Sequence, residues 1–490
     1  MASNYNKILL KDYDDLLSEN EKLNAKIKEQ SSEIKMLKDV ISELKDIIIK
    51  QNDKINTLIL EIERLKNNND KDSSNSSKPS SKNEFKKVKN SREKTDKKQG
   101  GQKGHKGSTS EVSTVKKLID SGKVKHNIIE VDKTKQNKNK DYKIRYIQDI
   151  KISTIINEYR YYPDEKGVFN IPKEQNNIVT YGNVIKSISM LLVHRAPASM
   201  DQTVNFLKAI TNGNFEITKS TLNNWTYSLS NNLDSILHEI EQGLYNSYYI
   251  NTDESPVNVN GKNQQLHNYS NEKYTLQYLH EKKSKSAMEE LNFLPNFQGT
   301  LIHDHNKVQY NFGTRHGECN AHILRYIKAV IDFTNHNWSI EMTNLLKNIL
   351  HHKHILLNKG ICFFDSKLLE EYSQKYDNIL KTATKEYQSD YEKNSYRDEE
   401  RRLITRLEEY KKNHLLFMYD FKIPFTNNRA EADIRPAKRK LNVGIFRSQK
   451  GAKCYLRIRS FISTFLKNKL NIFEGIQNIF NNKAILLNIR

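Results

Sequence analysis

Disulfide pairs, membrane spans and secretory signals are all missing from the pattern of this 490-residue chain. Its only cysteines, Cys319, Cys362 and Cys454, lie far apart, which excludes a disulfide-rich scaffold and fits a reducing compartment. No apolar run approaches the ~18 residues that a membrane-spanning helix needs. The first residues, MASNYNKILLKDYDD, lack the apolar stretch of a secretory signal. We therefore expect a cytoplasmic, nucleoid-associated protein with no membrane partner.

Acidic residues are too few to balance the basic ones. The chain has 80 Lys and Arg against 59 Asp and Glu, a formal net charge of +21. Such an excess favours a polyanionic partner, either nucleic acid or an anionic membrane surface. The abundance of Lys, Asn and Ile also fits an AT-rich genome, which would raise the charge without a functional cause. The length predicts two to four structural units.

A seven-residue repeat runs through the N-terminal segment. One heptad position holds mostly isoleucine, at Tyr13, Asn20, Ile27, Ile34, Ile41, Ile48, Ile55 and Ile62. A second position holds mostly leucine, at Leu16, Leu23, Gln30, Leu37, Leu44, Gln51, Leu58 and Leu65. This combination predicts a parallel two-stranded coiled coil over residues 8–67, whose polar positions would fix the register. An amphipathic helix packed on its own domain is the alternative.

The next segment, residues 68–110, has the composition of a flexible basic linker. It begins NNNDKDSSNSSKPSSK and ends near QGGQKGHKG. Residues 82–106 contain ten Lys and Arg against three acids, which suits contact with DNA phosphates. The predicted DNA-binding residues here are Lys97, Lys98, Lys103 and Lys106. A basic tail that only keeps the protein soluble is the alternative.

Two regions follow the linker. Residues 111–180 include YKIRYIQDIKISTIINEYRYYP, which predicts two short strands in a small β-rich region. Residues 181–240 have helical apolar spacing, with a glycine-containing turn before the last helix. Two helices, such a turn and a third helix predict either a helix-turn-helix DNA reader or ordinary helical packing.

Two aspartates follow strand-like segments in the centre of the chain. YNSYYINTDESPV turns from apolar to polar at Asp253, and GTLIHDHNK repeats the pattern with Asp304. Two strands and a short helix lie between them. This order predicts an α/β RNase H-like core, whose first part spans residues 241–335. Adjacent strands would bring the two carboxylates together, and a shared proton or divalent cations would relieve their repulsion. Oxygen ligands favour two Mg²⁺ or Mn²⁺ ions, which normally need a third carboxylate.

Histidines crowd the second aspartate, and a helical stretch follows. CNAH, which begins at Cys319, has the spacing of a soft-metal site, but packing and DNA contact explain this cluster better than zinc does, because a structural zinc site wants four clear ligands. Residues 336–420, with segments such as RDEERRLITRLEEYKKNH, predict a helical insertion into the core.

The last block, residues 421–465, predicts the second part of the core, with 466–490 as a C-terminal tail. FTNNRAEADIRPAKRK begins a stretch in which residues 429–459 contain ten Lys and Arg against two acids. Asn427 or Asn428 is expected to cap a helix that Pro436 kinks or ends. Glu431 either pairs with Arg435 on a solvated helix face or is the third carboxylate. Asp433 should point elsewhere on the helix. The predicted DNA-binding residues of this block are Arg429, Arg435, Lys438, Arg439, Lys440 and Arg447.

NNRAEADIRPAKRKLNVGIFRSQKGA closely resembles the third catalytic block of the insertion sequence sixty-six family of bacterial DDE transposases. Further similarities follow in the family's order: NSSKPSS, GGQKGHKG, YGNVIKSISMLLVHRAP, STLNNW, TDES, GTLIHDHNKVQYN and CNAHILRYI. The resemblance covers nearly the whole chain from about Ile27. It implies that Asp253, Asp304 and Glu431 form a catalytic triad of carboxylates holding two Mg²⁺ or Mn²⁺ ions.

The resemblance also implies an activity and a set of partners. The protein would bind the terminal inverted repeats of its own insertion sequence, cleave the DNA ends and transfer them into target DNA. The partners implied are double-stranded DNA, further copies of the chain and small accessory proteins of the same element. Family members usually carry a four-cysteine zinc module after the glycine-rich motif, yet no cysteine lies between His126 and Tyr181, so no zinc is expected there. Two alternatives stay open: a catalytically inactive or domesticated coiled-coil DNA-binding protein, and another RNase H-like nuclease such as a junction resolvase.

Overall fold

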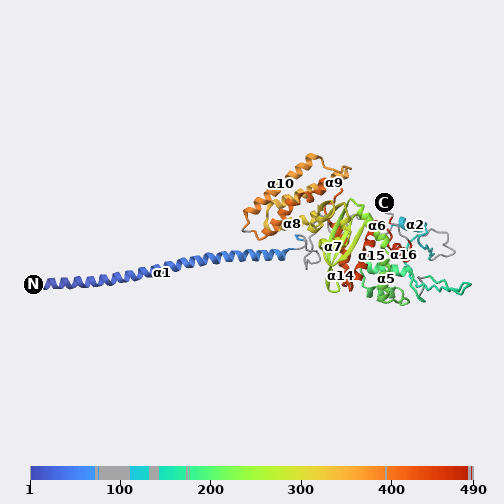
Figure 1. The fold of residues 1–490 in the computed structure, drawn as a ribbon, viewed down its shortest axis with the longest axis horizontal. Helices are drawn as coiled ribbons and strands as arrows, with labels where there is room; N and C mark the ends of the chain where they lie inside the picture. The colour runs from blue at the N-terminus through green and yellow to red at the C-terminus, as the bar shows by residue number, and fades with distance from the viewer. Residues whose placement is uncertain are drawn as a thin grey trace. The chain divides into compact units, whose positions relative to one another are not determined.

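The chain divides into two compact units in the computed structural model (Figure 1). The sheet unit combines Lys89–Cys319 with Thr426–Arg490, and the helical unit combines Met1–Val88 with Asn320–Phe425. The structure describes residues 2–71, 75–76, 111–131, 143–172, 175, 177–391, 394–483 and 487, with side chains in the first helix for 15–66. No helix within these ranges is long and apolar enough to cross a membrane.

The sheet unit is built on one mixed five-stranded sheet. Its strands are β1 (Tyr249–Val259), β2 (Lys262–Ser270), β3 (Thr275–His280), β4 (Thr300–His303) and β5 (Arg315–Glu318). The strand order is β3-β2-β1-β4-β5. The pairs β1–β2 and β2–β3 are antiparallel, while β4 runs parallel to β1 and β5 runs parallel to β4. The two strands that precede the predicted aspartates, β1 and β4, are therefore direct neighbours.

Strand alternation divides the apolar residues of the sheet between its two faces. On one face, Ile250, Tyr269 and Leu276 join a core formed with five helices: α3 (Asn183–Met190), α5 (Lys219–Asn231), α6 (Asp234–Tyr245), α15 (Gln449–Lys467) and α16 (Ile472–Phe480). On the other face, Val257, Leu266 and their neighbours pack against α14 (Asn428–Val443) and the start of α15. Asp253 is paired with Asn268 in the β1–β2 register, and strand parity places it on the α14 face.

Helix α15 covers the outer edge of the sheet. The N–H groups of Thr275 and Gln277 on the edge strand β3 donate to the hydroxyl groups of Thr464 and Ser460, at 3.1 and 2.9 Å. An exposed strand edge is prone to pairing with other chains, and this helix satisfies its donors instead. Between β1 and β2, Asn260 and Gly261 both have positive φ and form the tight turn of the hairpin.

The helices of the sheet unit are mostly capped by short polar side chains, as at Ser199, Thr218 and Ser448. They are α2 (Val112–Asp120), α3 (Asn183–Met190), α4 (Met200–Ile210), α5 (Lys219–Asn231), α6 (Asp234–Tyr245), α7 (Lys285–Glu290), α14 (Asn428–Val443), α15 (Gln449–Lys467) and α16 (Ile472–Phe480). A π-helix over Leu191–Arg195 extends α3, and short 3-10 helices span Leu294–Asn296 and Lys307–Asn311. The helical prediction for 181–240 is confirmed, whereas a DNA-reading role for it stays a prediction.

Two predictions for the ends of this unit are corrected. The two short strands expected within 111–180 are absent from its described residues, which contain α2 and no strand. The apolar side chains there are largely exposed, as at Ile147, and an isolated hairpin without a packing surface is marginal. The expected tail 466–490 contains α16, whose Ile476 and Ile479 are buried in the core because their spacing forms one apolar face.

The helical unit consists of one long helix and a group of shorter ones. They are α1 (Ala2–Asp70), α8 (Asn320–Thr334), α9 (Asn337–Asn358), α10 (Ser366–Ser389), α11 (Arg397–Glu409), α12 (Lys411–His414) and α13 (Leu416–Tyr419). A buried network joins three of the shorter segments, because His336 lies 2.6 Å from Glu400 and 3.0 Å from Asp390. The apolar heptad residues of α1, from Leu16 to Leu65, are each 51–66% exposed in the single chain.

Candidate active site

The parallel pairing of β1 and β4 brings the two predicted aspartates side by side. Asn251 pairs with Ile302, and each aspartate lies two residues further along its strand direction. Asp304 directly follows β4, as expected. Asp253 was expected at the end of a strand but lies within β1, which continues to Val259 because it also pairs with β2. What ends near Asp253 is the pairing with β4, whose last pair is Asn251 with Ile302.

Asn427 links the two aspartate strands to α14. Its side-chain N–H donates to the carbonyl oxygen of Thr252 at 2.7 Å and to the carboxylate of Asp304 at 3.3 Å. Its side-chain oxygen accepts from the amide of Asn251 at 3.0 Å. The residue is fully buried. Asn427 or Asn428 was expected to cap the helix. Asn427 occupies the N-cap position, but its side chain makes no capping hydrogen bond, since these cross-strand contacts use its amide group.

Glu431 lies in the first turn of α14, and its N–H donates to the carbonyl oxygen of Asn427 at 3.5 Å. Its carboxylate is close enough to Asp253 to change that residue's titration. Burial first, and then the carboxylates of Asp304, Glu254 and Glu431, hold the pKa of Asp253 well above its ordinary 3.8. The structure thus brings the three predicted carboxylates into one electrostatic cluster.

Glu254 is a fourth carboxylate that the sequence reasoning did not identify. It accepts hydrogen bonds from Asn306 at 3.0 Å and from Gln309, so it holds the turn that follows Asp304. Burial raises its pKa, although both hydrogen bonds act in the opposite direction. It lines a polar cavity of about 380 Å³ together with Asp304 and Lys283. Its position next to Asp253 in TDES was the only signal in the sequence.

Buried side chains also hold the segment after Asp304. His305 has a φ of 66°, an uncommon value for a residue with a side chain. Its Nδ1 contacts the buried carboxylate of Glu318, which also accepts from the hydroxyl of Tyr310. Burial lowers the pKa of the neighbouring His303 to about 3, so this histidine is neutral and packs within the fold.

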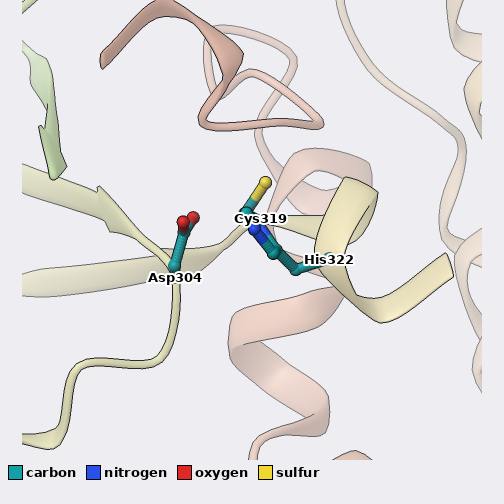
Figure 2. Close-up of side chains that lie close together, drawn as sticks. All are labelled: Asp304, Cys319 and His322. Carbon is teal, nitrogen blue, oxygen red and sulfur yellow. The ribbon is translucent and has the colours of Figure 1, made fainter. Parts of the chain in front are cut away.

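Cys319 lies next to Asp304, at the end of β5 (Figure 2). Its sulfur accepts a hydrogen bond from the backbone N–H of Asn427 at 3.1 Å. The thiol therefore helps to hold the start of α14 beside the two aspartates. His322, also drawn in Figure 2, belongs to the helical unit.

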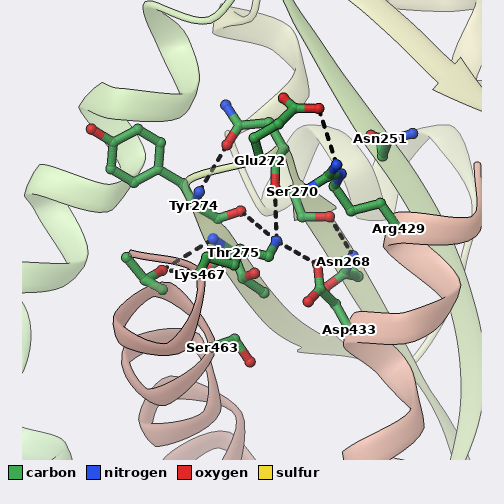
Figure 3. A network of polar contacts seen from close by, with 12 residues as sticks. Asn251, Asn268, Ser270, Glu272, Tyr274, Thr275, Arg429, Asp433, Ser463 and Lys467 are labelled. Carbon is green, nitrogen blue, oxygen red and sulfur yellow. Dashed lines mark hydrogen bonds and ion pairs between the residues drawn. The ribbon is translucent and has the colours of Figure 1, made fainter. Parts of the chain in front are cut away.

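A buried ion pair fixes the other side of α14 (Figure 3). The ammonium of Lys467 contacts the carboxylate of Asp433 at 2.7 Å and donates to the backbone oxygens of Asn271 and Tyr274 at 2.8 and 3.0 Å. This confirms that Asp433 points elsewhere than Glu431. Of the two outcomes expected at Pro436, an end is excluded, because the helix continues to Val443.

The predicted basic residues around α14 divide into fixed and exposed groups. Arg429 pairs with Glu272 at 3.2 Å (Figure 3), and Lys438 donates to the carbonyl oxygen of Pro256. Burial, and then the nearby charge of Arg447, lower the pKa of Lys440. Arg435, Arg439 and Arg447 are exposed. The other predicted DNA-binding residues, Lys97, Lys98, Lys103 and Lys106, lie outside the described residues.

The sheet unit thus gathers carboxylates from two parallel strands and from a helix much later in the chain. Such an α/β arrangement is suited to binding divalent cations. The sequence model of the family described as "Transposase IS66 family" matches residues 205–454, which include all three predicted carboxylates. The match spans half of the chain, and the chain therefore belongs to the IS66 family of transposases. Membership implies a transposase role, DNA binding and the use of a divalent metal. No curated protein matches the chain.

Proposed function

We propose that this transposase cleaves the ends of its own insertion sequence and joins them to target DNA at Asp253, Asp304 and Glu431. The observation that carries the proposal is the convergence of three distant segments through Asn427. In the proposed scheme the sheet, with its order β3-β2-β1-β4-β5, is an RNase H-like core, and residues 336–420 are inserted between its second and third carboxylates.

The donor set fits hard divalent cations. The three side chains offer carboxylate oxygens only. Burial first, and then the neighbouring carboxylates, raise the pKa of Asp253, and cations bound between the carboxylates would relieve their repulsion. Two Mg²⁺ or Mn²⁺ ions at such a site would activate the attacking oxygen and stabilise the leaving oxygen of a phosphodiester. No zinc is proposed for the N-terminal region.

The chain's own residues would hold the carboxylates in place during the reaction. Asn427 orients Asp304 through its side-chain N–H, and the α14 backbone fixes the position of Glu431. Glu254 holds the turn at Asn306 and so keeps Asp304 at the edge of the polar cavity. Water would attack first to release a 3′-hydroxyl, which would then attack target DNA, so the scheme needs no protein nucleophile.

We further propose that two copies of the chain associate through α1. The heptad residues from Leu16 to Leu65 are half exposed in the single chain, and a second helix is the partner that a seven-residue repeat specifies. Cleavage and joining at both ends of an element need two sets of carboxylates, which a dimer or a higher oligomer supplies. Small accessory proteins of the same element are further proposed partners.

Carboxamide variants test the proposed site. We expect Asp253→Asn and Glu431→Gln to reduce Mg²⁺-dependent cleavage of the element's end DNA by about 10³-fold or more, because each removes a charged metal ligand. DNA binding should persist in both variants, as it should after addition of EDTA. The exposed Glu281→Gln is the matched control and should cleave normally. Cleavage at the wild-type rate in either site variant would contradict the proposal.

The products separate this proposal from the two alternatives. A transposase joins the released 3′ ends to a second DNA, whereas a junction resolvase only hydrolyses, so a strand-transfer product on a supercoiled target distinguishes them. A catalytically inactive DNA-binding protein would bind the end DNA and yield neither product with Mg²⁺ or Mn²⁺.

A further inference from the structure

A groove of about 510 Å³ lies between α5 and the first half of α15, lined by residues that the proposed chemistry does not use. Three cations of α15 face it: Lys450, Lys453 and Arg457. Their spacing of three and four residues places them along one side of the helix. Asn231 and Gln449 add amide groups that can donate hydrogen bonds to an anion.

The groove has a net positive charge, although one of its cations pairs with a carboxylate. Arg457 donates to the carbonyl oxygen of Ser230 at 3.1 Å and pairs with Asp234, which is the only carboxylate among the described residues that line the groove. Arg457 and Asp234 therefore neutralise each other and fix the wall. The ammonium of Lys450 lies 4.7 Å over the ring of Tyr227, and Lys450 and Lys453 are both exposed. These two lysines remain to meet a ligand.

The start of α15 adds positive potential at the same place. Ser448 caps the helix by accepting from the N–H of Gly451 at 3.1 Å, and the helix then runs for 19 residues. The dipole of such a helix places about half a positive charge at its N-terminus. Backbone phosphate is a common ligand where lysines and a helix start face one opening.

Basic residues also occupy the stretch of chain between the proposed active site and the groove. Glu431 and the last residue of α14, Val443, are separated by 12 residues, or about 18 Å along a helix. The exposed Arg439 and Arg447 lie between Glu431 and the groove in the chain, and α15 begins directly afterwards. A length of 18 Å corresponds to about five nucleotides of a DNA strand.

We propose that the groove between α5 and α15 binds backbone phosphates of the DNA on which the carboxylates act, about five or more nucleotides from the reacting phosphodiester. The distance rests on the proposed function, but the phosphate contact does not. The contact would be independent of base sequence, since ammonium groups and helix N–H groups read charge and not base edges. It would give the chain a DNA contact within the family-matched region and apart from the basic linker.

The test measures how the full chain binds a fluorescent 30-base-pair duplex in EDTA over a range of salt concentrations. We expect Lys450→Gln/Lys453→Gln to weaken binding by roughly tenfold at low salt and to reduce the slope of log affinity against log salt by about 1.8, since each lost phosphate contact contributes about 0.9. The matched control is Lys469→Gln/Lys483→Gln, which removes the same charge from two exposed lysines beside α16. An equal loss in the control, or an unchanged slope in the groove variant, would overturn the proposal.

Two further measurements keep the result interpretable. Thermal unfolding and circular dichroism should match wild type for both double variants, because all four lysines are exposed. If the Gln variant unfolds, Lys450→Ala alone should still reduce the slope by about 0.9. The groove and the catalytic assignment can also fail separately. Normal cleavage by Asp253→Asn would remove the proposed function and leave the groove in place, whereas an unchanged salt slope would remove only the groove.

Discussion

Helices α1 and α14 differ in how much of their packing one chain supplies. In α14, Asn427 at the start, Asp433 in the middle and Lys438 near the end all have partners within the sheet unit. In α1, the twelve apolar residues at the heptad positions are each about half exposed. Helix α14 is completed by its own chain, and we propose that a second copy of the chain completes α1. The seven-residue repeat of α1 therefore indicates a partner that the contacts within one chain do not supply.

The largest effect is expected at the seam of α1. Ile48 occupies the first heptad position and Ile49 the next one, and both are similarly exposed in the single chain, at 55 and 59%. Ile48→Asp would place a carboxylate in the seam of each helix at a cost of several kcal/mol, whereas Ile49→Asp would leave it in water. Light scattering should find a monomer for the first variant and a dimer for the second. Two monomers, or two dimers, would break the comparison.

The buried ion pair of α14 should have the next largest effect. Asp433→Ala leaves the ammonium of Lys467 without its carboxylate, and we expect the free energy of unfolding to fall by about 3 kcal/mol. The neighbouring pair of Arg429 and Glu272 is exposed on both sides, so Glu272→Gln should cost no more than about 1 kcal/mol. Urea unfolding measures both. Equal losses would show that the buried pair does not anchor the helix.

Asn427 should matter less for stability than for cleavage. Asn427→Ala removes three hydrogen bonds and leaves buried polar atoms behind, which should cost about 1–3 kcal/mol. Cleavage by the folded fraction should fall further, by about 10- to 100-fold, because Asp304 and α14 lose their common link. The exposed neighbour Asn428→Ala is the control and should change neither quantity. A loss of stability with normal cleavage would reduce Asn427 to a packing residue.

The smallest effect is a pH dependence in the helical unit. Burial alone would lower the pKa of His336, but Glu400 and Asp390 raise it overall above its ordinary 6.5. A raised pKa stabilises the folded state below pH 6.5, and this stabilisation is lost as pH rises through the folded value. The difference in melting temperature between wild type and His336→Gln should therefore shrink as pH increases above 6.5. A constant difference would mean that His336 acts through packing alone.

The sequence predicted the local elements of this structure better than the contacts between distant segments. Helices at 181–240 and strands before Asp253 and Asp304 follow from apolar periodicity, which is local. The continuation of β1 beyond Asp253 was missed because the pairing with β2 extends the strand through a polar stretch. The expected strands at 142–163 failed in their described part because alternation predicts a strand only when a surface is available to cover it. Asn427 occupies the cap position of α14, as one of the two expected candidates, but the bonds of its side chain were missed, since they join it to Asn251 and Asp304, more than 100 positions away.

The charges of the site were predictable in type but not in detail. Two aspartates after strands and an acid in a basic helix signalled Asp253, Asp304 and Glu431. Apart from its position next to Asp253, nothing in the sequence separated Glu254 from an ordinary strand residue, because its role depends on Asn306 and Gln309 after the next aspartate strand. The groove between α5 and α15 was equally hidden, since its two walls lie more than 200 residues apart in the chain.

Manganese binding tests the convergence of the three carboxylates most directly. Electron paramagnetic resonance can count the Mn²⁺ ions bound by the full chain on end DNA in Ca²⁺-free buffer, without relying on turnover. The account predicts that Asp253→Asn, Asp304→Asn and Glu431→Gln each weaken the same bound Mn²⁺ signal, while Glu281→Gln preserves it. Undiminished Mn²⁺ binding by Glu431→Gln would contradict the account, because α14 would then lie outside the metal site.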